Sequence, residues 1–441
     1  MLIVGAGWGG IQYAVRMIQA GIPAQKIQII DPAATSICPF SEQRDMYLGI
    51  DIPAVRRFST GVLNRPKLPG VPGILDYRGE MFHTSCWAYD ITGGSPKDPS
   101  LDKLNNKTVA IIGTRASSVQ VVPQLTRWCK HLYVIQQTPA AVDIRDQRGT
   151  DERWFKEEVD RCEGWQRERM KNFNEHFTLG DPPSLNLVDD QWTRAPSLVG
   201  IAGNSNGPKL PSEIVAYTSK LIKIDTPRQN RIRAQVDKQV KGPVTAEKLK
   251  PWYPSFCKRP LFHDDYLATF NKDNVVGNEE YKADIIICAT GYRSPSTETH
   301  AGKANLAMIG KNGVSMSTEW PRQSGLGGNY AFTLGEYAKH AAYILSEAKR
   351  QANGKPFAVA PTAEAAENWA QLVLMNSAAM AVIVGCTLGY YNLEGELALL
   401  PVEYQAIAAW STLWGTGMED WLDVIEKWRA VGRMDGIEVR I

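Results

Sequence analysis

The sequence predicts an α/β protein with two βαβ units on parallel sheets, a helical insertion and a helical C-terminal segment. Twice, near residues 5 and 113, a short apolar run of strand type leads into a glycine-containing turn and then into a helical pattern. Parallel strands joined through a helix require a right-handed crossover, so the repeated plan predicts parallel sheets. The stretches from about 151 to 250 and from 346 to 441 show mainly helical patterns.

The composition is that of a globular protein, with 44% apolar and 22% charged residues in a chain of 441 residues. This length suggests two or three domains. The net charge of +2 and the lack of charge blocks give no strong attraction to nucleic acid. The start of the chain lacks a basic region and a cleavage site, and the cysteines occur singly, so we expect a cytoplasmic location.

The first unit opens the chain. Residues 2–4 form a short apolar run, residues 5–10 form a turn, and a helical pattern continues to about residue 21. A second strand is expected over residues 26–30. This order is the strand, turn, helix and strand of a βαβ unit.

The turn of the first unit matches the pattern GxGxxG at Gly5, Gly7 and Gly10. The first glycine makes a tight turn, the second lets the backbone approach a pyrophosphate, and the third lets the helix pack on the strand. Asp31 follows about twenty residues later, where an acid binds a ribose hydroxyl. A glycine-rich turn without a ligand is the alternative, and the flanking strand, helix and acid favour a dinucleotide site.

The second unit repeats the plan. Residues 107–112 and 131–135 are expected as strands, with the turn at residues 113–118 between them. The helix between them has one apolar face, formed by Val119, Val122, Leu125 and Trp128. A further buried-type strand is expected over residues 283–288.

Residues 372–391 carry no charge over a length close to that of a bilayer span. Polar residues and glycines interrupt this stretch, so a buried helix ending near Gly385 is favoured over membrane contact. The alternative of a peripheral membrane contact stays open.

A segment near residue 80 carries a family resemblance. Tyr77-Arg78-Gly79-Glu80-Met81-Phe82-His83-Thr84-Ser85-Cys86-Trp87 resembles the FxGxxxHxxxW fingerprint of Baeyer–Villiger monooxygenases, which are class B flavoprotein monooxygenases. Gly79, His83 and Trp87 match it, and Tyr77 replaces the phenylalanine. Other segments that resemble family motifs are Ser59-Thr60-Gly61, Cys257-Lys258-Arg259-Pro260, Ala289-Thr290-Gly291-Tyr292 and residues 385–392.

The resemblance implies two Rossmann-like dinucleotide-binding domains, one of the FAD type and one of the NADP type. We expect residues 1–65 and about 276–345 to form the shortened FAD-type domain. Residues 66–275 would form the NADP-type domain, with the helical insertion at about 151–250. Residues 346–441 would form the helical C-terminal segment.

The same resemblance implies that NADPH reduces FAD and that one oxygen atom of dioxygen is inserted into a ketone, giving an ester or lactone. A hydrophobic ketone from polyketide or terpenoid biosynthesis is the expected substrate. Arg259 is the implied catalytic residue, because a fixed cation in a dry site stabilises negative charge on oxygen by about 3 kcal/mol or more. Gly79, His83 and Trp87 would lie near the domain linker.

The implied cofactor residues fall on both turns and on the later motifs. They are Gly5, Gly7, Gly10, Asp31, Gly113, Thr114, Arg115, Ser118, Gln120, Gln137, Thr138, Lys258, Thr290 and Gly291. Lys258 would face the NADP phosphate. No metal site is predicted, because the cysteines and histidines lack ligand spacing.

Three features depart from the family pattern. Residues 32–58 lack a recognisable flavin-contacting segment and the usual carboxylate partner of Arg259. Arg115 stands at the middle glycine of the second turn, where a side chain obstructs a pyrophosphate. Gln137 replaces the arginine that grips the 2′-phosphate, and such a charge-assisted bond contributes about 1.5–3 kcal/mol.

These departures leave several alternatives open. The chain could be a degenerate non-redox descendant or pseudoenzyme of the same scaffold. A flavin reductase or a class B N-hydroxylase is less favoured, because the fingerprint argues against a hydroxylase. Arg259 could instead pair with a surface acid, and His263, Asp264 and Asp265 predict a solvated loop more than an acid–base or metal site.

Overall fold

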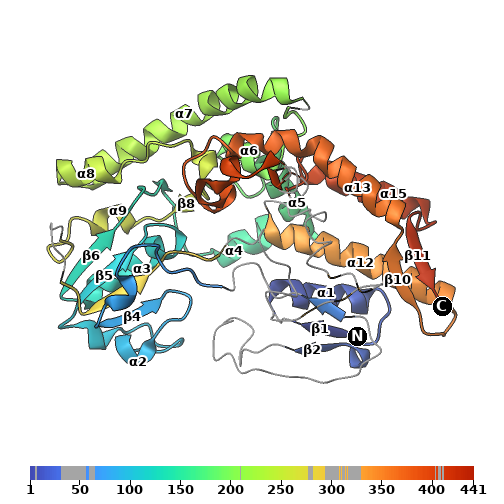
Figure 1. Cartoon of the computed structure of the whole chain (residues 1–441), viewed down its shortest axis with the longest axis horizontal. Helices are drawn as coiled ribbons and strands as arrows, with labels where there is room; N and C mark the ends of the chain where they lie inside the picture. The colour runs from blue at the N-terminus through green and yellow to red at the C-terminus, as the bar shows by residue number, and fades with distance from the viewer. Residues whose placement is uncertain are drawn as a thin grey trace. The chain divides into compact units, whose positions relative to one another are not determined.

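The computed structural model describes residues 1–4, 7–30, 56–58, 65–208, 210–276, 282–293, 307, 309, 313, 315, 329–402, 404–405, 409 and 412–441. The chain divides into two compact units, whose elements are labelled in Figure 1. The first unit comprises Met1–Asn64, Val159–Leu221 and Ser294–Ile441. The second unit comprises Arg65–Glu158 and Ile222–Arg293. Each unit is described by itself.

The described strands of the first unit's main sheet are β1 (Leu2–Val4), β2 (Gln28–Ile30) and β3 (Arg56–Phe58). They are parallel, in the order β2-β1-β3. Helix α1 (Trp8–Gln19) connects β1 to β2 after the glycine turn. The predicted βαβ unit at the start of the chain is therefore confirmed, and its second strand begins at Gln28, later than predicted.

Helix α12 (Tyr330–Ala352) packs along α1, and Figure 1 shows α1 between the sheet and α12. Alanines at 338 and 342 let the two helices approach, and Tyr13 and Met17 fill the space between them and β1. Gln12 Nε2 also donates a hydrogen bond of 3.1 Å to the Ala331 carbonyl oxygen. The helix that follows the first glycine turn is thus held by a helix far along the chain.

The remainder of the first unit is mostly helical, and it has a second core around Val373, Trp414 and Trp421. A two-stranded antiparallel sheet joins β10 to β11. The elements are η1 (Ala24–Lys26), α5 (Trp165–Thr178), η5 (Pro196–Leu198), α6 (Val199–Ala202), η6 (Pro211–Glu213), β10 (Ala358–Pro361), α13 (Ala363–Asn376), η11 (Ser377–Ile383), η12 (Tyr390–Leu399), α15 (Met418–Val431) and β11 (Ile437–Arg440).

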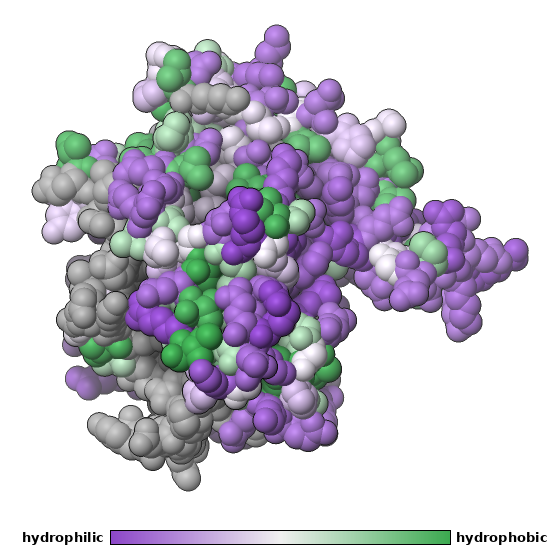
Figure 2. All heavy atoms as spheres, turned by 90° about the vertical axis from the view of Figure 1, so that its right-hand side faces the viewer, coloured by the Kyte–Doolittle hydropathy of each residue, from purple (hydrophilic) through white to green (hydrophobic). Residues whose placement is uncertain are grey.

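The uncharged stretch at residues 372–391 is not one long helix. Helix α13 ends at Asn376 and the 3-10 segment η11 follows, with Met380 and Val382 buried and Met375 exposed. Among the described residues, we find no helix that is long and apolar enough to cross a membrane. On the face drawn in Figure 2, hydrophilic side chains predominate and hydrophobic ones form small separate groups. The cytoplasmic location stays a prediction.

The second unit is built on a sheet whose described strands are β4 (Glu80–His83), β9 (Ile285–Cys288), β5 (Thr108–Ile112) and β6 (His131–Ile135), in that spatial order. All neighbouring pairs are parallel. Helix α3 (Ala116–Trp128) connects β5 to β6 and buries the predicted face through Val119, Val122 and Leu125. The second βαβ unit is therefore confirmed.

The domain boundaries differ from the predicted ones. Strand β9, assigned from the sequence to the first domain, lies between β4 and β5 in the second unit. Residues 159–221, expected within the NADP-type domain, group with the first unit, as do residues 346–441. A buried parallel strand such as Ile-Ile-Ile-Cys carries no local mark of its partners, because both of its faces are apolar.

The second unit also contains short elements around its main sheet. They are η2 (Ile74–Asp76), α2 (Tyr89–Thr92), η3 (Asp102–Leu104), β7 (Val142–Asp143), α4 (Glu152–Trp154), η4 (Phe155–Val159), α8 (Pro243–Leu249), η7 (Ser255–Cys257), β8 (Leu261–Phe262) and α9 (Tyr266–Thr269). Helix α7 (Ile214–Gln239) begins in the first unit and ends in the second.

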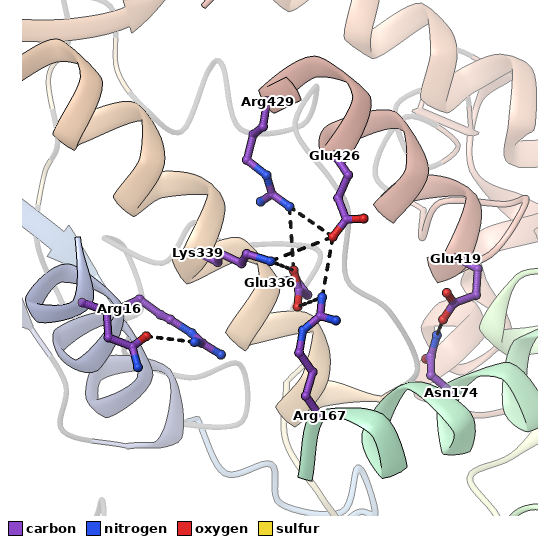
Figure 3. Close-up of polar contacts among 9 residues, drawn as sticks. Arg16, Arg167, Asn174, Glu336, Lys339, Glu419, Glu426 and Arg429 are labelled. Atoms are coloured by element: carbon purple, nitrogen blue, oxygen red, sulfur yellow. Dashed lines mark hydrogen bonds and ion pairs between the residues drawn. The ribbon is translucent and has the colours of Figure 1, made fainter. Parts of the chain in front are cut away.

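A buried carboxylate joins three helices of the first unit. Glu336 on α12 has a side chain that is 3% exposed, and Arg167 Nη2 on α5 lies 2.8 Å from its Oε1. Lys339 Nζ and Arg429 Nη2 lie 3.9 and 4.0 Å from its Oε2. Figure 3 shows these cations converging on Glu336, with Glu426 of α15 alongside. The cluster therefore fixes α5 and α15 against the helix that packs on α1.

Replacing Glu336 by glutamine should destabilise the first unit by about 3 kcal/mol or more, because it leaves partly buried cations without their carboxylate. Replacing the half-exposed Glu426 by glutamine should cost under about 1 kcal/mol. Urea unfolding of both variants measures the difference. Equal losses in the two variants would contradict the central place of Glu336.

His340 on α12 should make stability depend on pH. Burial, together with the positive charge of Arg429, lowers its pKa from 6.5 to about 4. Between these two values the unfolded chain binds more protons than the folded one, so stability rises with pH over this window, by up to about 3 kcal/mol. A His340→Gln variant should lose this part of the pH dependence, measured as the urea midpoint at pH 4.5 and 7. An unchanged slope would exclude His340 as its source.

Candidate functional site

The carboxyl ends of four parallel strands define one edge of the second unit's sheet. β4 ends at His83, β9 at Cys288, β5 at Ile112 and β6 at Ile135. Ligands of open α/β sheets bind at this edge, in the crevice outside the strand ends. The segments that follow these strands contain most of the site residues predicted for this unit.

The turn after β5 requires glycine at position 113. Gly113 has a φ of +103°, and a Cβ there would lie 2.6 Å from the Ala289 carbonyl oxygen. The fully buried Ser118 hydroxyl donates to the Gly113 carbonyl at 2.6 Å. Thr114 Oγ1 donates to the Thr138 carbonyl at 3.1 Å, which ties the turn to the segment after β6. Gly113, Thr114, Ser118 and Thr138 are thus brought together, and their contact with a cofactor stays a prediction.

Arg115 occupies the N-cap position of α3. Its φ of −93° and ψ of −159° are extended values that any residue adopts. The helix has thirteen residues, and its first N–H groups and positive dipole end suit an anion. Gln120 lies one turn further on, exposed, and donates to the Ala116 carbonyl at 2.8 Å. The backbone therefore accepts arginine at 115 without strain.

The end of β6 carries two neutral glutamines. Gln136 Nε2 donates to the Lys248 carbonyl at 2.7 Å, which fixes its amide group. Gln137 is exposed. This strand end therefore presents neither a carboxylate nor a guanidinium at positions 136 and 137.

The neighbours Lys258 and Arg259 lie in different environments. Lys258 is 5% exposed, and its Nζ lies 5.1 Å from the centre of the Tyr253 ring. Arg259 is exposed. Burial raises the pKa of Tyr253 to about 12, and the charges of Arg115 and Arg228 oppose this shift. A cation–π contact therefore holds Lys258, while Arg259 is accessible.

The fingerprint residues join β4 to β9. Tyr77 Oη donates to the Ala283 carbonyl at 2.8 Å. A Cβ at Gly79 would lie 2.8 Å from the Asp284 carbonyl oxygen and 2.2 Å from Tyr77 Oη. Trp87 Nε1 donates to Thr92 Oγ1 at 3.0 Å, and its ring meets Phe82 edge-on. The contacts of these residues are structural.

His83 lies at the end of β4 beside the segment after β9. Its Nδ1 is 2.7 Å from Ser85 Oγ, and its ring centre is 5.7 Å from that of Tyr292. Burial lowers the pKa of His83, against an opposing effect of the Gly291 backbone. His83 Nδ1 also accepts the Ser85 N–H at 3.2 Å, so the hydrogen bonds of this ring lie within the turn after β4.

Thr290 and Gly291 anchor the segment where the chain enters the second unit. Lys67 N–H donates to the Gly291 carbonyl at 3.0 Å. The Thr290 hydroxyl donates to the Lys67 carbonyl. These two residues connect the strand edge to the chain just after Arg65.

The glycine turn of the first unit is described in part. Gly7 is the N-cap of α1, and a Cβ there would meet nothing within 4 Å. Gly10 is buried within the first turn of α1. Gly5, Asp31, Ser59-Thr60-Gly61 and nearly all of residues 32–58 lie outside the described residues. Among the described residues, the space beside Gly7 at the N-terminus of α1 is therefore open to a group of the size of a methyl.

The loop at residues 263–265 is structural. The Asp264 carboxylate accepts three backbone N–H groups, from Arg145, Asp146 and Gln147, at 2.8–2.9 Å. His263 Nδ1 accepts hydrogen bonds from the backbone N–H groups of Asp265 and Tyr266. Over the described ranges, no group of histidine, cysteine and acidic side chains is arranged to hold a metal ion. The contacts of this loop are with the backbone of nearby segments, and the solvated-loop interpretation stays a prediction.

The sequence did not predict a buried ionic contact of the second unit, between Asp143 and two arginines. Asp143 is 1% exposed, and its Oδ2 lies 3.2 Å from Arg228 Nε and 2.5 Å from Arg231 Nη2. Arg228 also stands 5.7 Å from the centre of the Phe262 ring. Asp143 and its partners are more than eighty residues apart, so no local pattern predicts the contact.

The chain is similar to fungal FAD-binding monooxygenases. It is 37% identical over 429 residues to "FAD-binding monooxygenase andJ" of Emericella variicolor, covering 87% of this chain and 66% of that protein. It is 37% identical over 445 residues to "FAD-binding monooxygenase prhK" of Penicillium brasilianum, covering 90% and 68%. The chain spans 62–66% of the length of andJ and of two further curated relatives, both FAD-binding monooxygenases named ausC. No family model matches.

Solved structures share the fold. The chain matches "Polycyclic Ketone Monooxygenase from the Thermophilic Fungus Thermothelomyces thermophila" with a TM-score of 0.86 and 28% identity, covering all of this chain and 89% of that one. It matches a complex of OTEMO with FAD and NADP with a TM-score of 0.64 and 18% identity, covering 100% and 99%. The latter likeness shows the fold alone, and both confirm the predicted two-domain α/β class with helical segments.

Replacing Gly79 by alanine should destabilise the second unit by about 1–3 kcal/mol, because the new methyl group forces β4 away from the Asp284 carbonyl. Gly70→Ala is the matched control, since a Cβ there meets nothing within 4 Å. Thermal unfolding of both variants measures the contrast. Similar melting temperatures for the two would contradict the close approach at Gly79.

Proposed function

This chain belongs to the Baeyer–Villiger type of FAD-binding flavoprotein monooxygenases, and we propose that it uses FAD and NADPH to insert one oxygen atom into a ketone. The product would be an ester or a lactone. Two curated relatives are named FAD-binding monooxygenases, and solved structures of the same fold contain FAD and NADP.

The observation that carries the proposal is the glycine turn after β5. Gly113 has a positive φ, the turn leads into the N-terminus of a thirteen-residue helix, and it lies at the carboxyl edge of a parallel sheet. These three features together are those of a dinucleotide site. At the first turn, Gly7 is the N-cap of the twelve-residue helix α1, which follows the parallel strand β1 and is the proposed site of the flavin nucleotide.

A bound flavin supplies the redox and oxygen-transfer chemistry, and the chain supplies binding, orientation and charge. Helices α1 and α3 direct N–H groups toward the two nucleotides. Arg259, which is exposed, is the proposed catalytic cation for negative charge developing on oxygen. Lys258 holds this segment in place through its contact with the Tyr253 ring.

A hydrophobic, polycyclic ketone is the proposed substrate. One relative, from Thermothelomyces thermophilus, is named polycyclic ketone monooxygenase, and the chain is 34% identical to it over 432 residues. Biosynthesis of a polyketide or terpenoid secondary metabolite is the proposed setting.

A second candidate is a non-redox descendant of the same scaffold. Arg115 at the N-cap of α3 favours it, because any side chain at this position hinders the approach of a pyrophosphate to the backbone. The two candidates differ in flavin binding and in NADPH oxidation.

The visible spectrum of the purified protein, incubated with FAD and desalted, separates the two candidates. Retained flavin and NADPH oxidation stimulated by a polycyclic ketone, with an ester or lactone detected by mass spectrometry, are expected. A protein that retains no FAD and oxidises no NADPH would contradict the monooxygenase and support the non-redox descendant.

Arg259→Ala should reduce ester formation at least about a thousandfold while flavin reduction by NADPH continues, because a lost cation of about 4 kcal/mol acts only on the oxygen-transfer step. Arg127→Ala, which removes an exposed arginine of α3, is the matched control and should leave both rates unchanged. Undiminished ester formation in Arg259→Ala would remove this residue from the mechanism.

A further inference from the structure

We propose that the nucleotide crevice of the second unit does not select for the 2′-phosphate, so that NADH serves this chain about as well as NADPH. This inference rests on the proposed function and narrows it. It concerns the strand end at β6, the turn at Arg115 and the environment of Lys258.

In a dinucleotide-binding βαβ unit, residues at the end of the second strand contact the adenosine ribose. An acid there binds the ribose hydroxyls of NAD, and a nearby arginine accommodates the 2′-phosphate of NADP. In this chain the residues after β6 are Gln136 and Gln137, which carry no charge. Neither attraction nor repulsion toward a phosphate therefore arises from this strand end.

The amide of Gln136 is also bonded within the fold. Its Nε2 donates one of its two N–H groups to the Lys248 carbonyl at 2.7 Å, which restricts the orientation of the amide and leaves one N–H group. Lys248 itself is exposed, and a hydrated surface ammonium gives only a weak, salt-screened attraction.

Lys258 is poorly placed to bind a 2′-phosphate. The residue is 5% exposed, and its Nζ stands 5.1 Å from the centre of the Tyr253 ring. Tyr253 is itself buried, and its hydroxyl accepts the Ala141 N–H at 3.0 Å. A movement of the ammonium away from this ring would cost the cation–π contact.

Arg115, in the turn after β5, would contact the pyrophosphate, a group that NAD and NADP share. Arg115 caps α3, the helix whose N-terminus faces the pyrophosphate in this fold. A guanidinium at this position contributes equally to NAD and NADP, because their pyrophosphates are identical. The positive charge of Arg115 therefore cannot distinguish NADP from NAD.

Calorimetric titration of the FAD-loaded full chain with NADP⁺ and with NAD⁺ tests the inference. The two dissociation constants should lie within about threefold of each other. Gln137→Arg should tighten NADP⁺ binding by about tenfold and leave NAD⁺ unchanged, since one charge-assisted contact is worth a factor of this size. Asn106→Arg, which adds the same charge at an exposed position before β5, is the matched control and should alter neither constant.

A wild-type preference for NADP⁺ above tenfold would overturn the inference and leave the proposed monooxygenase intact. So would a Gln137→Arg variant that gains no NADP⁺ affinity over the control while remaining folded by circular dichroism. Binding of neither coenzyme to a chain that retains FAD would overturn both the inference and the use of a nicotinamide coenzyme.

Discussion

The second unit depends on how closely the neighbours of β9 approach it. Gly79, before β4, and Gly113, after β5, both face carbonyl oxygens of the β9 segment, those of Asp284 and Ala289. A Cβ at either position would lie within 2.8 Å of that oxygen, so both positions are restricted to glycine. The two approaches lie at opposite ends of β9, and the one at Gly113 shapes the turn after β5.

In the first unit, helix packing and an ionic cluster hold the helix that follows the glycine turn. Its glycine turn opens α1, and α12 holds α1 through small residues and through Gln12. Helix α12 is in turn held by the charge cluster at Glu336, where partly buried cations meet the carboxylates of Glu336 and Glu426. Close backbone packing therefore orders one glycine turn, and a partly buried ionic network around Glu336 supports the helix that packs beside the other. Removing one partner from such a network leaves buried charge uncompensated.

Local patterns predicted the local parts of this fold. Both βαβ units, the apolar face of α3 and the turn residues Gly113 to Ser118 follow from strand, glycine and helix signals within thirty residues. The place of β9, the pair Asp143–Arg228 and the cluster at Glu336 could not be predicted, because their partners lie eighty or more residues away. The roles of Arg259 and of the cofactor residues stay predictions.

Position 115 differs from position 113 in the kind of constraint that acts on it. Gly113 has a φ of +103° and a carbonyl oxygen in the way of any side chain, so folding itself demands glycine there. Arg115 has an extended backbone that suits any residue, so a glycine at this position would serve only the approach of a ligand. The arginine at 115 therefore bears on the proposed nucleotide site, and the backbone at this position accepts any residue. Gln137, exposed after β6, is of the same kind, and this is why both departures fall where binding can change without loss of the scaffold.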